Sequence, residues 1–265
     1  MSKQPIGVFD SGIGGLTVLR ALLEHLPHES FVYFGDTARV PYGNKSTETV
    51  RRFSSENVHL LLERGVKMVV VACNTATADA LPQLQSEFSL PIVGVIEPGV
   101  RAAIAATRNG RIGVIGTSGT IRSGAYQNGI IALLPDARVH SKACPLFVPL
   151  VEEGWTDTPV TRLVVEEYLR NYTALQIDTL VLGCTHYPLL KPAIGALLGP
   201  SVTLVDSAIE TAREVGNVLK KHTLASKAGD RRFDIILSDT SPTFAEIASR
   251  FLGRRAPEIE LVSVR

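Results

Sequence analysis

The sequence predicts an α/β protein with parallel sheets that is built from a duplicated unit. Two apolar, β-branched runs each end in a cysteine followed by polar residues, at Cys73 and at Cys184. A second pair of segments, IGVFDSGIGG from Ile6 and IGVIGTSGTIRSG from Ile112, reads as strand, glycine-containing turn and helix. The offsets are 106 residues between the isoleucines and 111 between the cysteines. Such near-equal offsets indicate a repeated unit of about 100 residues.

Composition and charge exclude several classes of protein. The 265 residues fit one large α/β domain or two smaller ones. Lysine and arginine number 27 against 26 acidic residues, without a basic run, so we expect no nucleic-acid binding. A strand begins almost at once, and no apolar run reaches the ~18 residues of a membrane helix. Three cysteines without a CxxC pair fit a reducing compartment, so a cytoplasmic protein without a membrane segment is expected.

The first half of the chain is expected to alternate strands and helices. Apolar runs predict strands at residues 6–9, 31–35, 69–72 and 91–95. Helical spacing predicts helices at residues 16–26, 46–64 and 76–88, the last one kinked or begun by Pro82. Between the second strand and the second helix, DTARVPYGN reads as a polar loop of the kind that carries function.

The second half repeats this order and then adds a C-terminal segment. Strands are expected at residues 112–116, 180–183 and 202–206, and helices at 158–175 and 207–222. A polar linker at residues 226–230 precedes a strand at 233–239, a helix at 243–253 and a terminal strand at 260–264.

The first glycine turn does not match the known nucleotide-binding loops. Gly12, Gly14 and Gly15 follow Asp10 and Ser11, but the Lys-Ser/Thr of a Walker A loop and the spacing of a dinucleotide fingerprint are missing. The turn predicts a helix N-terminus that offers N–H groups to an anion, with a carboxylate at its mouth.

The paired cysteines are the main candidates for chemistry. A strand-end cysteine is commonly a small core residue, but a matched pair followed by polar groups favours a site. A thiol of pKa ~8.5 must be tuned by its neighbours. If one sulfur is a thiolate and the other a thiol, they can invert a stereocentre without a cofactor by removing and delivering protons on opposite faces. The residues that could assist are Asp10, Asp36, Glu152 and His186.

Other thiol chemistries fit this pattern less well. A hydrolase built on Cys184 and His186 would leave Cys73 unused. A zinc site from the same three residues lacks CxxC or HxxxH spacing.

Four motifs together carry a family resemblance. DSGIGG, GDTARVPYG, ACNTA and GCTHYPLL occur in this order over nearly the whole chain, which resembles the bacterial glutamate racemases of the aspartate/glutamate racemase family. ACNTA and GCTHYP alone would also admit aspartate racemases, whereas the PYG loop and CPLFVPLVEEG favour glutamate.

The resemblance implies a fold and a function. The fold would be two pseudosymmetric parallel-sheet α/β domains facing each other across a central active site, with domain I at residues 1–97 plus 208–265 and domain II at 98–207. The function would be interconversion of L- and D-glutamate without pyridoxal phosphate, metal or other cofactor, to supply D-glutamate for peptidoglycan. A homodimer is expected. The rival hypotheses are another amino-acid racemase and a non-catalytic amino-acid-binding module.

The resemblance also implies residue roles. Cys73 would be the base for D-glutamate and Cys184 the base for L-glutamate. Asp10, Glu152 or its neighbour Glu153, and His186 would assist, with Asp36 as a lesser candidate. The groups expected to hold the amino acid are Asp10, Ser11, Pro41, Tyr42, Gly43, Asn74, Thr75, Thr117, Thr120, Thr185 and His186.

Overall fold

The structure is a computed structural model that describes residues 4–227, 231–241 and 244–264. The chain divides into two compact units, one formed by Met1–Val95 with Ala208–Arg265 and the other by Ile96–Ser207. The second unit begins where helix α4 (Ile96–Ala106) starts, two residues before the expected domain boundary.

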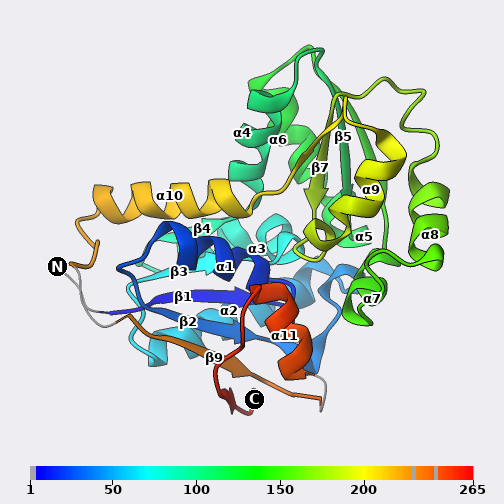
Figure 1. The fold of residues 1–265 in the computed structure, drawn as a ribbon. Coiled ribbons are helices and arrows are strands. Elements are labelled where there is room, and N and C mark those ends of the chain that lie inside the picture. Colours follow the sequence, from blue (N-terminus) through cyan, green and yellow to red (C-terminus); the bar gives the residue numbers. More distant parts are fainter. Residues whose placement is uncertain (1–3, 228–230, 242–243, 265) are drawn as a thin grey trace. The chain divides into compact units, whose positions relative to one another are not determined.

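The first unit contains a parallel sheet in the order β10-β9-β2-β1-β3-β4 (Figure 1). Its strands are β1 (Ile6–Asp10), β2 (Phe31–Gly35), β3 (Met68–Val71), β4 (Ile92–Gly94), β9 (Phe233–Leu237) and β10 (Ile259–Leu261). Every residue of β1, β2 and β3 is buried, which explains why their sequences are continuously apolar rather than alternating.

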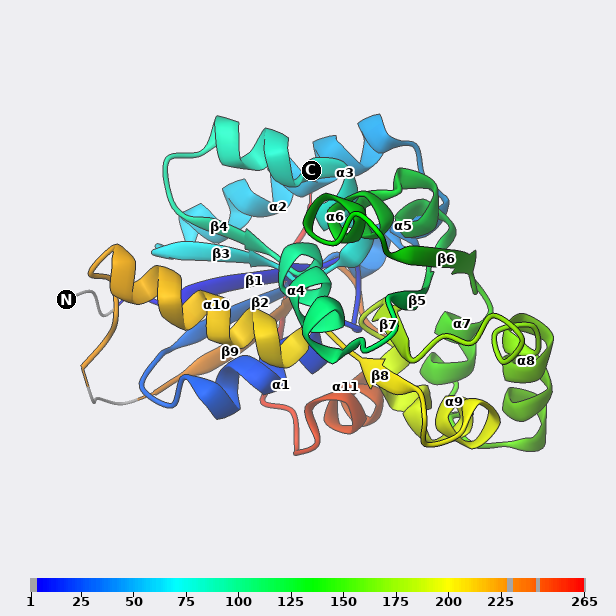
Figure 2. The same ribbon diagram turned by 90° about the horizontal axis from the view of Figure 1, so that it is seen from above.

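Helices cover both faces of this sheet (Figure 2). They are α1 (Leu16–His25), α2 (Thr47–Glu63), α3 (Asn74–Glu87), α10 (Ala208–Lys221) and α11 (Phe244–Leu252). Helices α2 and α3 pack together on one face, and α1 packs with α10 and α11 on the other. Two short 3-10 turns, η1 (Thr37–Arg39) and η2 (Tyr42–Asn44), occupy the predicted polar loop between β2 and α2.

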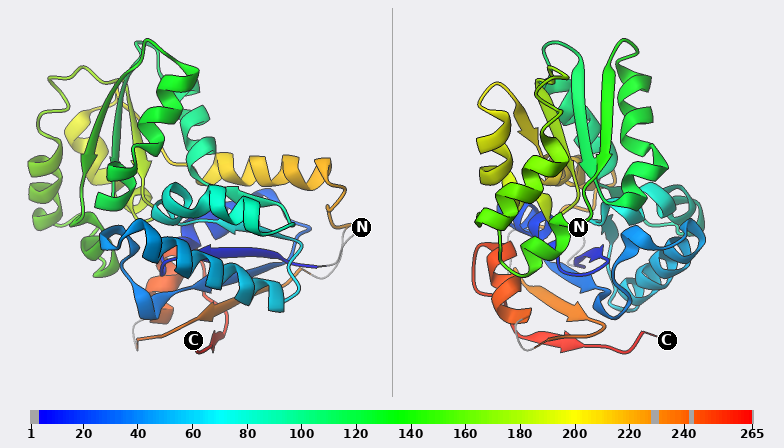
Figure 3. Two further views of the ribbon diagram at one scale, coloured as in Figure 1. Left: turned by 180° about the vertical axis from the view of Figure 1, so that it is seen from behind. Right: turned by 90° about the vertical axis from the view of Figure 1, so that its right-hand side faces the viewer.

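The second unit has a four-stranded parallel sheet in the order β6-β5-β7-β8 (Figure 3). Its strands are β5 (Arg111–Gly116), β6 (Arg138–Ala143), β7 (Thr179–Gly183) and β8 (Thr203–Val205). Besides α4, its helices are α5 (Ser118–Ser123), α6 (Ala125–Leu133), α7 (Phe147–Glu152), α8 (Pro159–Leu169), η3 (Tyr187–Leu190) and α9 (Lys191–Leu198). The order β6-β5-β7-β8 reproduces β2-β1-β3-β4 of the first unit. The predicted duplication is therefore confirmed at the level of topology.

One of the two alternatives for the helix after Cys73 was wrong. The helix after Cys73 begins at Asn74 and runs through Pro82, so the proline does not start it. Glu97, Pro98 and Gly99, which follow the fourth strand, lie in the first part of α4. A proline is tolerated there because N–H groups in the first turn have no intrahelical partner. Part of the expected linker at 226–230, and the expected start of the last helix at residue 243, lie outside the described residues.

Within the described part of the chain, no helix is both long enough and apolar enough to cross a membrane.

Candidate active site

Three predicted site residues of the first unit lie at the carboxyl edge of its sheet. Asp10 ends β1, Asp36 follows β2 and Cys73 follows β3. These strands are neighbours and parallel, and the backbone N–H of Asp36 donates to the carbonyl of Asp10 at 3.1 Å. The parallel order therefore brings together residues that lie 63 positions apart in the sequence, from Asp10 to Cys73. This edge is where open α/β sheets bind their ligands.

Cys73 is the N-cap of α3. Its Sγ accepts a hydrogen bond from the backbone N–H of Ala76 at 3.4 Å and lies 3.6 Å from Oγ of Ser11, to which it donates. The free N–H groups and the dipole at a helix N-terminus stabilise a negative charge. The sulfur of Cys73 therefore lies where the N-terminus of α3 can stabilise a negative charge.

The glycine turn is held beside Cys73 by Tyr33. The backbone N–H of Gly12 donates to the carboxylate of Asp10 at 3.0 Å, and the buried hydroxyl of Tyr33 donates to the carbonyl of Gly12 at 2.8 Å. Burial, with the nearby charges of Asp10 and Cys73, raises the pKa of Tyr33, so the phenol stays protonated and remains a donor. A Cβ at Gly15 would lie 2.5 Å from Cβ of Asp10, so only glycine fits there.

In the predicted loop Pro41–Gly43, the polar group of the Tyr42 side chain is already hydrogen-bonded within the protein. The ring of Tyr42 is buried, and its hydroxyl donates to Asp36 and accepts from Asn57 at 3.1 Å. Because this hydroxyl already has two partners, Tyr42 can offer a ligand only its backbone.

The second unit builds its thiol site with a histidine. Sγ of Cys184 lies 3.8 Å from Nδ1 of His186, and Nε2 of His186 lies 3.0 Å from the carboxylate of Glu152. Of the two adjacent glutamates, Glu152 makes this contact, while Glu153 is the C-cap of α7.

The environment of His186 favours its charged form. Burial alone would lower the pKa of the imidazole, but hydrogen bonds to Cys184 and Glu152 and their negative charges outweigh it and raise the pKa to about 10. At neutral pH both ring nitrogens therefore carry protons. The imidazolium donates to Glu152 on one side and faces the sulfur of Cys184 on the other.

The other predicted binding residues lie at helix N-termini or directly after the cysteines. Thr117 is the N-cap of α5, where its Oγ1 accepts from the backbone N–H of Thr120 at 3.2 Å and lies 3.1 Å from the Thr120 hydroxyl. The residues directly after the cysteines, Asn74, Thr75 and Thr185, are buried.

The third cysteine, Cys144, is not part of either arrangement. Its side chain is fully buried, its thiol donates to the carbonyl of Lys142 at 3.8 Å, and burial raises its pKa to about 12. Cys144 is therefore an unreactive core residue.

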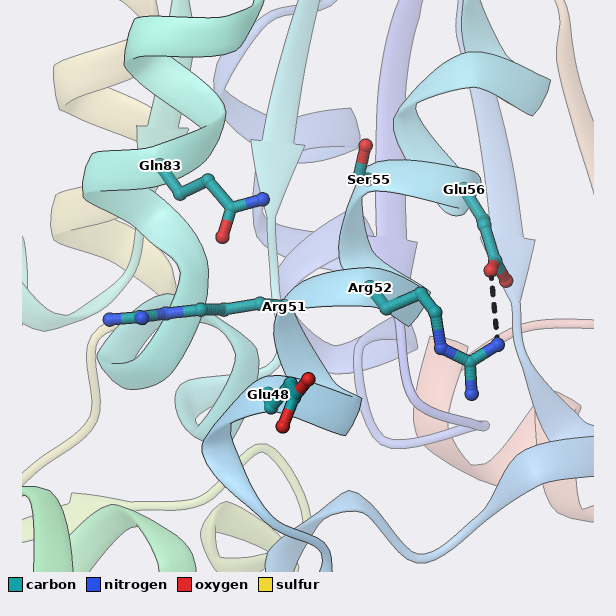
Figure 4. A pocket seen from close by; sticks show the side chains of 6 residues that line it. All are labelled: Glu48, Arg51, Arg52, Ser55, Glu56 and Gln83. Carbon is teal, nitrogen blue, oxygen red and sulfur yellow. Dashed lines mark hydrogen bonds and ion pairs between the residues drawn. The ribbon is translucent and has the colours of Figure 1, made fainter.

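The alternatives to the thiol arrangements are a metal site and a surface pocket. Among the residues that the structure places, no three His, Cys, Asp or Glu side chains are grouped as ligands for a metal ion. A pocket of about 500 Å³ on α2 and α3 is lined by Glu48, Arg51, Arg52, Ser55, Glu56 and Gln83 (Figure 4). Arg51 and Arg52 point to opposite sides of it, one bonded to the carbonyl of Asp79 and the other to Glu56. No predicted site residue lines this pocket.

Sequence reasoning missed the residues that support the site, Tyr33, Arg39 and Asn57. The sequence does contain a signal for Asn57, because it is a polar residue at a position on the otherwise apolar, buried face of α2. Tyr33 reads as one more apolar strand residue.

Fold and site define a class: a duplicated parallel α/β enzyme with a thiol at the carboxyl edge of each sheet. The sequence profile described as "Asp/Glu/Hydantoin racemase" matches residues 6–215. The chain is 52% identical over 267 residues to the glutamate racemase of Geobacter metallireducens, covering 100% of this chain and 98% of that protein.

Solved structures agree with the sequence comparison. A glutamate racemase isoform of Bacillus anthracis has a TM-score of 0.94 and 42% identity, with 98% of both chains covered. The glutamate racemase of Francisella tularensis in complex with D-glutamate has a TM-score of 0.93 and 36% identity, covering 100% of this chain and 99% of that one. The chain belongs to the Asp/Glu/Hydantoin racemase family and is an isomerase of amino acids.

Proposed function

We propose that this chain is a glutamate racemase that uses two cysteines, Cys73 and Cys184, as its acid–base pair. The observation that carries the proposal is their equivalent position: each lies within two residues of the end of the third strand, in chain order, of a four-strand pattern found in both units. Glutamate is the proposed substrate because the relatives are named glutamate racemases and one was solved with D-glutamate.

In the proposed reaction Cys73 is the base for D-glutamate and Cys184 the base for L-glutamate. One thiolate removes the α-proton, and the thiol of the other cysteine donates a proton to the opposite face of the carbanion. The first sulfur ends as a thiol and the second as a thiolate, so protons and charge balance. The enzyme is then ready for the reverse reaction, and exchange with water resets it.

The neighbours of each sulfur suit this task. The N-terminus of α3 and Ser11 support Cys73, and the imidazolium of His186, oriented by Glu152, supports Cys184. We assign Asp10 to assist at Cys73, because Asp10 and Cys73 both lie near Tyr33.

We further propose that hydroxyl, amide and backbone N–H groups hold the two carboxylates of glutamate, and that Asp10 pairs with its ammonium group. The proposed binding groups are Ser11, Pro41, Tyr42, Gly43, Asn74, Thr75, Thr117, Thr120, Thr185 and His186, with Tyr42 contributing its backbone.

In the cell, the proposed enzyme works in the cytoplasm as a homodimer without a cofactor and supplies D-glutamate for peptidoglycan. We propose that its two units act as domains with one cysteine each, as the sequence predicts.

Replacing either cysteine tests the proposal. Cys73→Ala and Cys184→Ala should each lower the rate of glutamate racemisation by about 10²–10⁴-fold, because each removes one partner in proton transfer. Circular dichroism of L- and D-glutamate mixtures would measure this rate in both directions. Cys144→Ala is the matched control, since that thiol has no proposed role, and it should retain activity. Full activity in either of the first two variants would contradict the two-base mechanism.

A further inference from the structure

The carboxylate of Asp36 is surrounded by donors within the first unit. Nε of Arg39 donates to its two oxygens at 2.9 and 2.8 Å, the hydroxyl of Tyr42 donates to one of them, and the hydroxyl of Ser238 donates to the other at 3.2 Å. The Asp36 side chain has no exposed surface. A carboxylate with three side-chain donors and no contact with water is poorly suited to shuttle protons.

Asn57 of α2 completes the network from the other side. Its amide oxygen accepts from Arg39 at 3.0 Å, and its amide nitrogen donates to the hydroxyl of Tyr42 at 3.1 Å. Arg39 also pairs with Glu56, and its guanidinium lies 4.0 Å above the ring of Phe53. Asp36 and Asn57 therefore hold the Tyr42 hydroxyl directly, and Arg39 holds Asp36 and Asn57 in place.

Burial and the Asp36 charge raise the pKa of Tyr42, so its phenol keeps the proton that it donates. Tyr42 begins the turn η2, and Gly43 is the next residue. Fixing this ring therefore fixes the backbone that connects β2 to α2.

We propose that Asp36, Arg39 and Asn57 are positioning residues that act through Tyr42 to hold Pro41–Gly43 in its substrate-binding conformation. The inference rests on the proposed function, in which Pro41–Gly43 contacts glutamate. It gives Asp36 a role in substrate affinity and none in proton transfer.

The chain provides a matched pair of arginines for the test. Arg39 and Arg52 both pair with Glu56 and both lie over Phe53, at 4.0 and 4.8 Å, but only Arg39 reaches Asp36 and Asn57. Lysine cannot reproduce the forked contacts of arginine. Arg39→Lys and Tyr42→Phe should raise KM for glutamate about tenfold or more and leave kcat within about threefold. Arg52→Lys should change neither constant.

Amide hydrogen exchange of residues 37–44 gives a second readout that needs no substrate. Exchange should be faster than in the unmodified protein in Arg39→Lys and Tyr42→Phe, and unchanged in Arg52→Lys. The same exchange rates in all four proteins would overturn the proposal, as would a tenfold lower kcat with unchanged KM in Arg39→Lys or Tyr42→Phe. If the unmodified protein does not racemise glutamate, the proposed function fails, while the exchange rates still decide whether this network holds the loop.

Discussion

The two candidate thiols have different partners. Cys73 is placed at a helix N-terminus beside Ser11, whereas Cys184 faces the His186 imidazole, which is held by Glu152. A helix N-terminus offers partial charge, and an imidazolium offers a full one that depends on pH. Only the second arrangement is therefore expected to lose its positive charge as pH rises through about 10.

His186 should make the stability of the protein depend on pH. Its folded-state pKa is raised from 6.5 to about 10, so the stabilisation from its proton is fully present below pH 6.5 and is lost as pH rises through about 10. Urea unfolding of the unmodified protein and of His186→Asn at pH 6, 8 and 10 would measure this contribution to the free energy of unfolding. The difference in free energy of unfolding should shrink across this range, and a constant difference would show that the histidine is neutral in the folded protein.

At the scale of elements, opposite ends of the strands serve different purposes in the first unit. The thiol site lies at the carboxyl edge of the sheet, while Glu29 and Lys67 lie just before β2 and β3, at the amino edge. Nζ of Lys67 is 2.5 Å from the Glu29 carboxylate and donates to Ser226 at 3.0 Å, and both charged side chains are almost fully buried. This ion pair ties the segment after α10 to the sheet.

Lys67→Met should therefore destabilise the fold without directly affecting the chemistry. Removing one partner leaves the Glu29 charge buried and unpaired, which costs about 3–5 kcal/mol. Arg64→Met is the matched control, because Arg64 and Glu260 form a two-point ion pair that is partly exposed and is worth at most about 1 kcal/mol. Chemical denaturation would compare the two variants, and equal losses would contradict a special role for the buried pair.

For the whole molecule, one strand order used twice explains the site. In each unit the third strand in chain order, β3 or β7, lies beside the first, β1 or β5. The cysteine after the third strand therefore reaches the same edge of the sheet as the turn after the first strand. Ser11 and Cys73 meet in this way in one unit, and Thr117 and Cys184 take the matching places in the other.

The fold class and the cysteines were predictable, since continuous apolar strands and matched offsets are visible in the sequence. The helix after Cys73 was predicted at residues 76–88, whereas α3 begins two residues earlier, at Asn74, and contains Pro82 in its interior. The contacts of the Tyr42 hydroxyl with Asp36 and Asn57 were not predictable either. Those contacts join residues on separate elements, and a single sequence contains no signal for such distances.

The most direct test of the central claim is to incubate the purified protein with L-glutamate in deuterium oxide, without added cofactor. The α-proton signal and the optical rotation would be followed together, with L-aspartate in parallel. We predict that both signals decay for glutamate and that aspartate reacts much more slowly. Retention of both signals with glutamate would contradict the proposed racemase, and faster exchange with aspartate would contradict the proposed substrate.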